Sequence, residues 1–175
     1  INITFNAKMR RTSICGATET ILCHKDVAKQ VLPPLLEKLL NSGCEIRGDS
    51  DVVLLNKKIK KASKQDWEKE YLDTIVSIKV VDSLSEAIEH INNYSSKHTD
   101  AIITNNTKNS KLFLTQIESA IVMHNTSTQF SDGAEFGLGA EIGISTGKLH
   151  ARGPVSTQEL TTYKYIVKGN GQLRQ

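Results

Sequence analysis

Hydrophobic residues recur along the first 125 positions with two spacings that alternate along the chain. Short runs rich in β-branched residues predict strands at 19–23, 44–46, 75–81, 101–104 and 120–123, and 52–55 is a possible further strand. Between the runs, apolar residues spaced by three and four predict helices in 1–11, 27–40, 84–91 and 107–117. Because strands that alternate with helices pair in parallel through right-handed crossovers, the pattern predicts a three-layer α/β unit with a parallel sheet.

Polar residues at the ends of these segments predict where the helices begin and stop. Asp26 is expected to cap the second helix, Ser83 and Glu86 to form a capping box, and Thr107 to cap the last helix. The pair Pro33-Pro34 interrupts the second helix, so we expect a kink or a restart there.

A basic run at 57–61 allows two interpretations, an anion-binding patch or a solvated surface. No aromatic or glycine framework accompanies it, which favours the solvated surface. Trp67 and Tyr71 are expected to anchor this excursion to the body of the protein.

Composition excludes several classes of function. A net charge of +3 with 5% aromatic residues gives no footprint for nucleic-acid binding, and no apolar run is long enough to cross a membrane. Cys15, Cys23 and Cys44 form no CxxC pair, which favours a reducing cytosol over a disulfide framework and offers no zinc-like ligand spacing. The chain opens at Ile1 without methionine or signal peptide, which fits a processed or engineered end or a fragment.

Residues 124–154 are rich in turn-forming residues and follow a predicted strand. Long loops at the carboxyl ends of strands are where open α/β sheets bind their ligands, so this loop is expected to be functional. Gly137 and Gly139 do not begin a dinucleotide fingerprint, because Gly143 is one position too late for GxGxxG and no strand leads into the motif.

Cys15 follows three cations, Lys8, Arg10 and Arg11, and has small neighbours. This setting suits a thiolate nucleophile beside an anionic substrate, since cations lower the pKa of a thiol. On residue type alone, however, a free cysteine near a strand is more often a small buried hydrophobe.

Four motifs resemble those of the gamma-glutamyl phosphate reductases, a branch of the aldehyde dehydrogenase superfamily. They are Asn6-Ala7-Lys8 followed by Cys15-Gly16-Ala17-Thr18-Glu19-Thr20, the signature from Asn125 to Ile144, the segment Lys148 to Pro154, and Leu160 to Tyr165. Many members of the family have Asn where Gly16 stands, Gln-Arg-Pro where Arg10-Arg11-Thr12 stands, and Arg where Gln129 stands.

The resemblance implies an aldehyde-dehydrogenase-type catalytic domain. It divides the chain into a catalytic α/β domain at 1–124, a loop region at 125–157 that faces the substrate and the cofactor domain, and an oligomerisation arm at 158–175 that contains a strand. The chain would then be the carboxy-terminal portion of a protein whose amino-terminal NADP-binding domain lies outside these residues.

The family reduces L-glutamyl 5-phosphate with NADPH to L-glutamate 5-semialdehyde in proline biosynthesis. By resemblance Cys15 would form a thioester, with its own backbone amide as the donor to the oxyanion. The residues that would bind substrate are Lys8, Arg11, Asn125, His150 and Arg152. The cofactor would be contacted by Glu135 and Phe136. Arg10 and Lys148 are further candidates for the anionic groups, and Asn125 has the alternative role of bracing its loop. The family further implies a cytoplasmic homodimer or higher oligomer, association with glutamate 5-kinase, and no metal.

Two alternatives stay open. The chain could be a non-catalytic remnant or dimerisation fragment, because hydride transfer needs the cofactor domain. It could also be another enzyme of the superfamily, hydrolytic or CoA-dependent, although the signature at 132–137 speaks against that interpretation.

Overall fold

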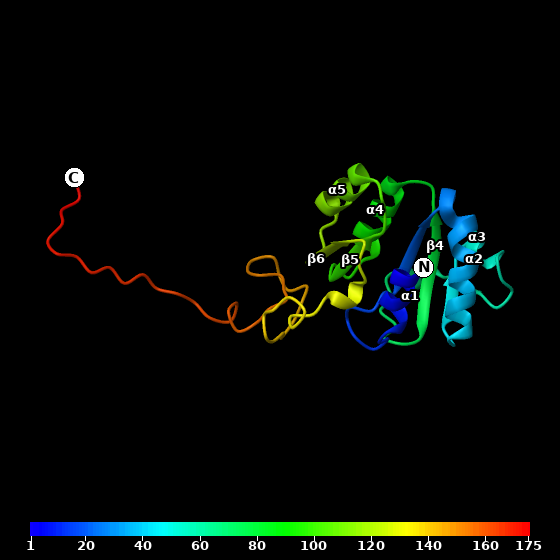
Figure 1. Ribbon diagram of the computed structural model, residues 1–175, viewed down its shortest axis with the longest axis horizontal. Coiled ribbons are helices and arrows are strands. Elements are labelled where there is room, and N and C mark those ends of the chain that lie inside the picture. The colour runs from blue at the N-terminus through cyan, green and yellow to red at the C-terminus, as the bar shows by residue number, and fades with distance from the viewer.

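The computed structural model describes all 175 residues. Its elements in chain order are α1 (Asn2–Met9), β1 (Thr20–His24), α2 (Lys25–Asn41), β2 (Glu45–Gly48), α3 (Ser50–Val53), β3 (Lys60–Lys61), the 3-10 turn η1 (Lys64–Trp67), β4 (Ile75–Val81), α4 (Leu84–Tyr94), β5 (Thr99–Ile102), α5 (Thr107–Gln116), β6 (Ile121–His124) and the 3-10 turn η2 (Thr128–Phe130) (Figure 1). The predicted alternation of strands and helices is confirmed.

The strands all pair in parallel, as predicted, but they form two sheets rather than one. β4 lies inside a four-stranded sheet of order β1-β4-β2-β3, and β5 pairs only with β6. Register pairs Thr20 with Ser77 across β1 and β4, and Thr99 with Ile121 across β5 and β6. The edges of β1 and β5 therefore remain without a hydrogen-bonded neighbour, and both line a cleft described below.

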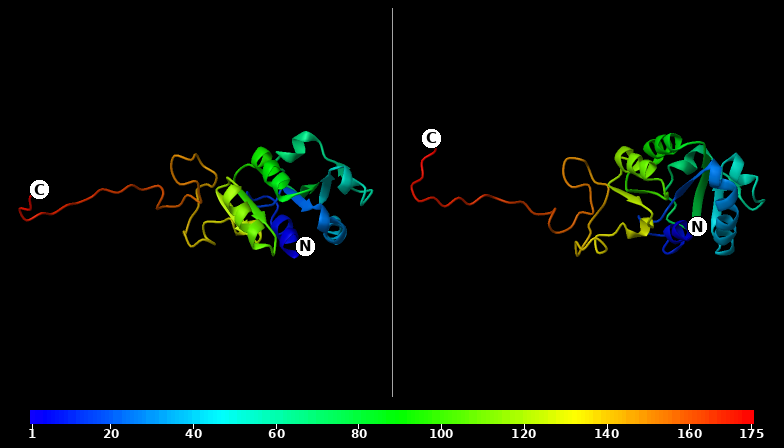
Figure 2. Two further views of the ribbon diagram at one scale, coloured as in Figure 1. Left: turned by 90° about the horizontal axis from the view of Figure 1, so that it is seen from above. Right: turned by 45° about the horizontal axis from the view of Figure 1, so that its top comes forward.

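The main core lies between α2 and the larger sheet. One face of α2 is completely or almost completely buried, and it packs on strand residues that are equally inaccessible to solvent. The helix contributes Leu32, Leu35, Leu36 and Leu39, and the sheet contributes Ile46, Val76 and Ile78. Each such side chain contributes roughly 2 kcal/mol through the hydrophobic effect. Figures 1 and 2 show α2 and α4 on opposite sides of β4, so the layers are helix, sheet and helix.

The two prolines of α2 do not restart the helix, contrary to the expectation from sequence. Pro33 and Pro34 lie inside one helix that continues to Asn41. Both prolines are exposed, as are Lys29 and Gln30 one turn earlier, whose carbonyls lose their intrahelical donors. Those carbonyls can be solvated, while the buried leucine stripe holds the helix to the sheet.

Several helix starts and one strand also differ from the sequence predictions. Residues 52–55 are not a strand, because Asp49 accepts hydrogen bonds from Asp51 N and Val52 N and thereby starts the short helix α3. The other caps fall close to the predicted residues. His24 caps α2 in place of Asp26, and Asn106 caps α5 in place of Thr107. Ser83 caps α4 as predicted, but the Glu86 carboxylate accepts from Asp82 N rather than from Ser83 N. The strand predicted at 101–104 begins two residues earlier, at Thr99.

The excursion at 57–74 is fastened by Asp66. This buried carboxylate accepts hydrogen bonds from Arg47 Nη1 at 2.5 Å, from Tyr71 Oη at 2.7 Å and from Ser63 N at 2.7 Å. Burial alone would raise the pKa of Asp66, but these donors outweigh it and hold the pKa well below its usual range. The predicted anchoring by Tyr71 is confirmed, and the lysines of the run at 57–61 are exposed, as a solvated surface requires.

After η2 the chain forms no further helix or strand. An antiparallel bridge joins Gly143 to Val155 and closes a loop between them. Residues 157–175 are all exposed and run away from the body (Figures 1 and 2), so the strand predicted within the arm at 158–175 has no pairing partner in this chain. None of the helices is both long and apolar enough to cross a bilayer.

Candidate active site

Cys15 differs from the other two cysteines in its exposure. It lies in the loop between α1 and β1 and is exposed, whereas Cys23 and Cys44 are buried. The interpretation of a cysteine as a small buried hydrophobe therefore fits Cys23 and Cys44 and does not fit Cys15. An exposed thiol at the start of a parallel sheet is open to reagents and substrates.

The loop that carries Cys15 is pressed against the segment 127–131. A Cβ atom placed on Gly16 would lie 3.0 Å from Thr128 O, so a larger residue at this position would require the two segments to move apart by a few tenths of an ångström. The hydroxyls of Thr18 and Thr128 hydrogen-bond at 3.0 Å, and Thr18 N donates to Ala7 O at 3.0 Å. Two signatures that are far apart in the sequence thus form one site.

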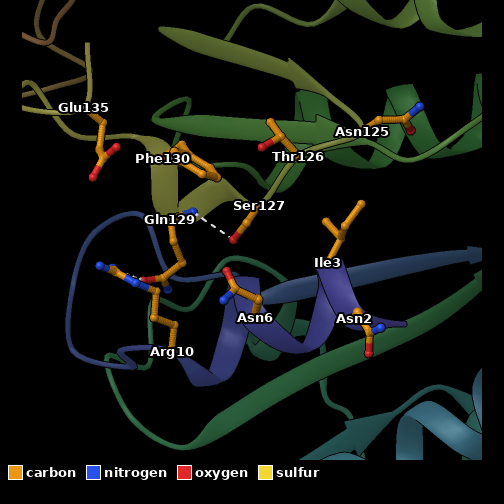
Figure 3. Close-up of a pocket in the computed structure, with 10 residues that line it drawn as sticks. All are labelled: Asn2, Ile3, Asn6, Arg10, Asn125, Thr126, Ser127, Gln129, Phe130 and Glu135. Atoms are coloured by element: carbon orange, nitrogen blue, oxygen red, sulfur yellow. Dashed lines mark hydrogen bonds between the residues drawn. The ribbon is translucent and has the colours of Figure 1, made fainter. Parts of the chain in front are cut away.

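Gln129 makes the largest number of these connections. Its buried side chain donates from Nε2 to Ala7 O at 2.8 Å and to Arg11 O at 3.1 Å. Its Oε1 accepts from Arg10 Nη1 at 3.5 Å, a contact that Figure 3 shows. Sequence reasoning registered Gln129 only as a missing cation. The structure shows that it ties the end of α1 and the loop of Cys15 to η2.

Two cavities adjoin these segments. A cleft of about 700 Å³ runs along the edges of β1 and β5 and is also lined by Cys15, His98 and Thr128. A second, polar cavity of about 550 Å³ is lined by ten residues: Asn2, Ile3, Asn6, Arg10, Asn125, Thr126, Ser127, Gln129, Phe130 and Glu135 (Figure 3). Cys15 lines the first cavity only, while Asn125 and Glu135 line the second only.

The electrostatic setting of Cys15 is the reverse of the one predicted. Although Cys15 is exposed, partial desolvation of its sulfur is the largest effect on its pKa and raises it. The carboxylate of Glu141 raises the pKa further, and the peptide N–H groups of Cys15 and Gly16 lower it. The prediction that the preceding cations depress the pKa of this thiol is wrong, because the net shift of its pKa is upward. Two of the three cations are engaged elsewhere. Arg10 contacts Gln129, and Lys8 is buried. Cys15 is therefore held mainly as a neutral thiol at neutral pH.

Lys8 is not available to a substrate anion, which corrects its assignment as a substrate-binding residue. Its side chain is completely buried, and its Nζ pairs with Glu19 Oε2 at 2.7 Å. Glu19 also accepts a hydrogen bond from Leu72 N at 3.0 Å. Burial raises the pKa of Glu19 more than Lys8 lowers it. The pair joins α1 to the start of β1 beneath the loop of Cys15.

Asn125 has both atoms of its side-chain amide occupied. Oδ1 accepts from Thr104 N at 2.9 Å and Nδ2 donates to Thr104 O at 3.0 Å. Its φ of 55° lies in the left-handed region that asparagine tolerates. Of the two roles left open by the sequence, the structure favours bracing of the loop after β6.

The remaining candidates lie on exposed loops. Arg152 donates to Glu118 O and Lys148 pairs with the carboxylate of Glu118, so both fasten the loop at 143–155 to the segment after α5. Arg11 and His150 have exposed side chains that form no hydrogen bond or ion pair within the chain. Glu135 and Phe136 are also exposed. Of the candidate anion-binding residues in this group, only Arg11 and His150 have free side chains.

His98 is a residue of the cleft that the sequence did not single out. Its Nδ1 lies 2.8 Å from Thr99 Oγ1, which in turn hydrogen-bonds to Ser131 Oγ. Its Nε2 is buried and has no hydrogen-bond partner. Burial lowers the pKa of His98, so the ring is neutral at neutral pH. A single histidine before a strand carries no sequence signal that could have revealed this arrangement.

No three side chains of histidine, cysteine, aspartate or glutamate are grouped so that they could hold a metal ion.

The chain is similar to gamma-glutamyl phosphate reductases over nearly its whole length. It is 55% identical to that of Rhodospirillum rubrum over 174 residues, 99% of this chain and 41% of the relative. It is 58% identical to that of Sphingopyxis alaskensis over 99% of this chain and 40% of the relative. The chain thus spans about two fifths of the length of the curated relatives it matches. No protein-family model matches it.

Solved structures agree with the sequence comparison. A crystal structure of gamma-glutamyl phosphate reductase from Thermotoga maritima superposes on all of this chain and 42% of its own, with a TM-score of 0.94 and 46% identity. An acetylating aldehyde dehydrogenase from Geobacillus thermoglucosidasius covers 99% of this chain and 48% of its own with a TM-score of 0.65 at 13% identity, which shows the fold alone. The resemblance inferred from the motifs and the aldehyde-dehydrogenase-type fold are both confirmed.

Proposed function

We propose that residues 1–175 form the catalytic portion of an NADPH-dependent gamma-glutamyl phosphate reductase, which converts L-glutamyl 5-phosphate to L-glutamate 5-semialdehyde and phosphate in proline biosynthesis. The observation that carries the proposal is 55% identity to such a reductase over 99% of the chain. The single exposed cysteine of the chain supports it, because it lies in the cleft beside the signature loop.

In this proposal the Cys15 thiolate attacks the acyl carbon of the substrate, expels phosphate and leaves a thioester. The N–H groups of Cys15 and Gly16 donate to no backbone carbonyl in the structure. Both lower the pKa of the Cys15 thiol, so both lie near the sulfur. Two free N–H groups beside the nucleophile can stabilise the oxyanion that forms on the substrate carbonyl. This pair extends the prediction from sequence, which named the Cys15 amide alone.

The substrate carries a phosphate and a carboxylate, and we assign their recognition to the exposed cations near the signature loop. Arg11 and His150 are free to contact an anion, and Arg152 keeps donors besides the one directed at Glu118 O. Arginine suits this task because its planar guanidinium binds carboxylate and phosphate with two parallel hydrogen bonds. Asn125 is assigned to bracing instead, since Thr104 occupies its amide.

The cofactor, NADPH, supplies the hydride that reduces the thioester. The chain offers no glycine-rich strand-to-helix turn of its own for the phosphates of a dinucleotide. It does present Glu135 and Phe136 with exposed side chains on the loop after η2. These residues fit a cofactor that is held by another part of the enzyme and reaches the loop from outside, and we expect them to contact it there.

We further propose that residues 158–175 dock on a second subunit. Four apolar or aromatic side chains of this segment, Tyr163, Tyr165, Ile166 and Val167, are each more than 70% exposed. An extended segment with such side chains is suited to adding a strand to the sheet of a partner. Association with glutamate 5-kinase stays a prediction.

Alkylation of the three cysteines tests the proposal. The 175-residue chain is treated with iodoacetamide over a range of pH, and the rate at each cysteine is followed by mass spectrometry. We expect Cys15 to react fastest and the buried Cys23 and Cys44 to be protected. Equal rates at the three sites would indicate that the active centre is not assembled, and would favour a non-catalytic remnant. We expect the isolated chain to show no NADPH-dependent turnover.

A further inference from the structure

We infer that the polar cavity between α1 and η2 binds an α-amino-acid headgroup, beside the contact between Arg10 and Gln129. In this assignment Arg10 receives the carboxylate of the ligand and Glu135 receives its ammonium group. The inference goes beyond the proposed function, because it is argued from the cavity alone. The glutamyl group of the proposed substrate is one source of such a headgroup, and a free amino acid is the other.

The cavity has two walls that come from distant parts of the sequence. Asn2, Asn6 and Arg10 recur every four residues, so they lie on one face of α1 and of the residue that ends it. The segment 125–130 and Glu135 form the other wall. A ligand in the cavity would therefore contact both the end of α1 and the signature loop.

The charged groups of the cavity lie at one end of it. Figure 3 shows the guanidinium of Arg10 and the carboxylate of Glu135 to one side of Gln129, and Ile3 to the other. The two hydrophobic side chains of the lining are Ile3 and Phe130. A molecule with a charged head and a short aliphatic chain matches this division.

Neither charge is paired within the chain. The side chain of Arg10 has one contact, in which Nη1 donates to the neutral Gln129 Oε1 at 3.5 Å, a long distance for a hydrogen bond. Glu135 forms no hydrogen bond or ion pair through its carboxylate, and both residues are exposed. Most of the five N–H donors of Arg10 are therefore open to a carboxylate, which a guanidinium binds with two parallel hydrogen bonds.

The opposite signs of the two charges select the ligand. A phosphate ion would be attracted by Arg10 and repelled by Glu135, whereas a zwitterionic headgroup gains from both. Asn6 lines the same cavity and its amide forms no hydrogen bond within the chain, so it can add a donor to the carboxylate. Glu135 thereby serves this cavity, and Phe136, which lines neither cavity, is left to face the cofactor.

The sequence departs from the family motif at both ends of the contact between Arg10 and Gln129. Many members have glutamine at position 10 and arginine at position 129, and this chain has the reverse. The structure brings the two positions together, so the two departures exchange an amide and a guanidinium across one contact. The cavity keeps one cation and one amide in either arrangement, which a ligand requires and a solvated surface does not.

Calorimetric titration of the 175-residue chain with three probes tests the inference. L-glutamate carries both charged groups of the headgroup, glutarate lacks the ammonium group, and inorganic phosphate has neither. We expect L-glutamate to bind more tightly than glutarate, and we expect phosphate not to displace it.

Two substitutions separate the charges. Arg10→Gln should weaken the binding of L-glutamate and of glutarate at least about tenfold. Glu135→Gln should weaken the binding of L-glutamate alone. Arg174→Gln is the matched control, because Arg174 is exposed, lines neither cavity and loses the same charge.

An exchange variant, Arg10→Gln with Gln129→Arg, tests the location of the cation. The guanidinium introduced at position 129 has enough donors to bond the carbonyls of Ala7 and Arg11 and still to meet a ligand. This variant should regain most of the affinity that Arg10→Gln loses. Protection of the buried cysteines, Cys23 and Cys44, from alkylation reports that each variant is folded.

Several results overturn the inference. They are a wild-type chain that binds no L-glutamate, an Arg10→Gln chain that loses no more affinity than Arg174→Gln, and a folded exchange variant that binds no better than Arg10→Gln. Displacement of L-glutamate by phosphate, or a Glu135→Gln chain that keeps its preference for L-glutamate over glutarate, also overturns it, because the ammonium group is then not recognised by Glu135.

Alkylation of Cys15 distinguishes the two sources of the headgroup. If the headgroup belongs to the substrate, saturating L-glutamate slows alkylation of Cys15, and glycine, which has no side chain to reach the sulfur, does not. If neither changes the rate, the cavity takes a free amino acid. The proposed function fails by a different result, in which Cys15 without any ligand reacts no faster than Cys23 and Cys44.

Discussion

Gln129 and Ala7 lie 122 positions apart in the sequence, yet Gln129 Nε2 donates a hydrogen bond to Ala7 O at 2.8 Å. Both residues are buried. The same amide nitrogen also bonds to Arg11 O, so one side chain satisfies two carbonyls at the end of α1 and at the start of the loop of Cys15. The position of Cys15 thus depends on a residue of the signature loop.

Replacement of Gln129 by leucine is expected to lower the free energy of unfolding by about 2 to 4 kcal/mol, because two carbonyls lose their donor and one of them is buried. Urea denaturation measures this loss. Gln30→Leu, on the exposed face of α2, is the matched control and should change stability by less than about 0.5 kcal/mol. Similar losses in the two variants would contradict a specific role of Gln129.

Glu141→Gln is expected to lower the pKa of Cys15 and to raise its alkylation rate at neutral pH. The substitution removes a negative charge that disfavours the thiolate. It can keep the hydrogen bond that Glu141 Oε2 accepts from Gly133 N at 2.8 Å, so the loop is preserved. The measurement is the midpoint of the pH profile of alkylation. Glu135→Gln, on the same loop, is the control and should leave the midpoint unchanged. A midpoint in Glu141→Gln that is unchanged or higher would show that Glu141 does not raise the pKa of Cys15.

Local patterns predicted the alternation of strands and helices correctly, because β-branched runs and leucine spacing report burial directly. The strand Ile75–Val81 has the predicted boundaries. The α3 helix was missed because it depends on the single cap of Asp49, whose effect exceeds the strand propensity of two valines.

The site was predictable only as far as its chemistry is encoded in neighbouring residues. The motif around Cys15 identified the nucleophile we propose. It also suggested that Lys8 and Arg10 lower the pKa of the thiol, because proximity in sequence was taken for proximity in space. Their real partners, Glu19 and Gln129, are brought to them by the fold. The environment of His98 likewise depends on Ser131, which lies 32 positions from the intervening Thr99.

Asp66→Asn is expected to make stability less dependent on pH in acid. The pKa of Asp66 lies below its ordinary value of 3.8, so the unfolded chain binds the proton more tightly than the folded chain does. The stabilisation is therefore complete above that ordinary value and is lost as the pH falls toward the folded pKa. The variant should cost about 2 to 3 kcal/mol at neutral pH and progressively less below about pH 4. Urea denaturation between neutral pH and acid measures the loss of stability, and Asp51→Asn, at an exposed position, is the control. An equal loss of stability at every pH would contradict a lowered pKa of Asp66.

Lys8→Met separates the two roles considered for Lys8. If Lys8 bound a substrate anion, its loss would leave the fold intact. Because Lys8 is completely buried against Glu19, we expect instead a loss of about 3 to 5 kcal/mol, since the substitution leaves a largely buried carboxylate without its cation. Lys29→Met, at an exposed position of α2, is the matched control.

The double variant Lys8→Met with Glu19→Gln shows whether the cost arises from the unpaired carboxylate. Its second substitution removes the uncompensated charge and can keep an acceptor for Leu72 N, so the double variant should be more stable than Lys8→Met alone. Thermal and urea unfolding of the wild-type chain, Lys8→Met, Glu19→Gln and the double variant give the coupling between the two positions. A stable Lys8→Met chain would make Lys8 a candidate for substrate binding again. A double variant that is no more stable than Lys8→Met would show that the cost does not arise from the unpaired carboxylate.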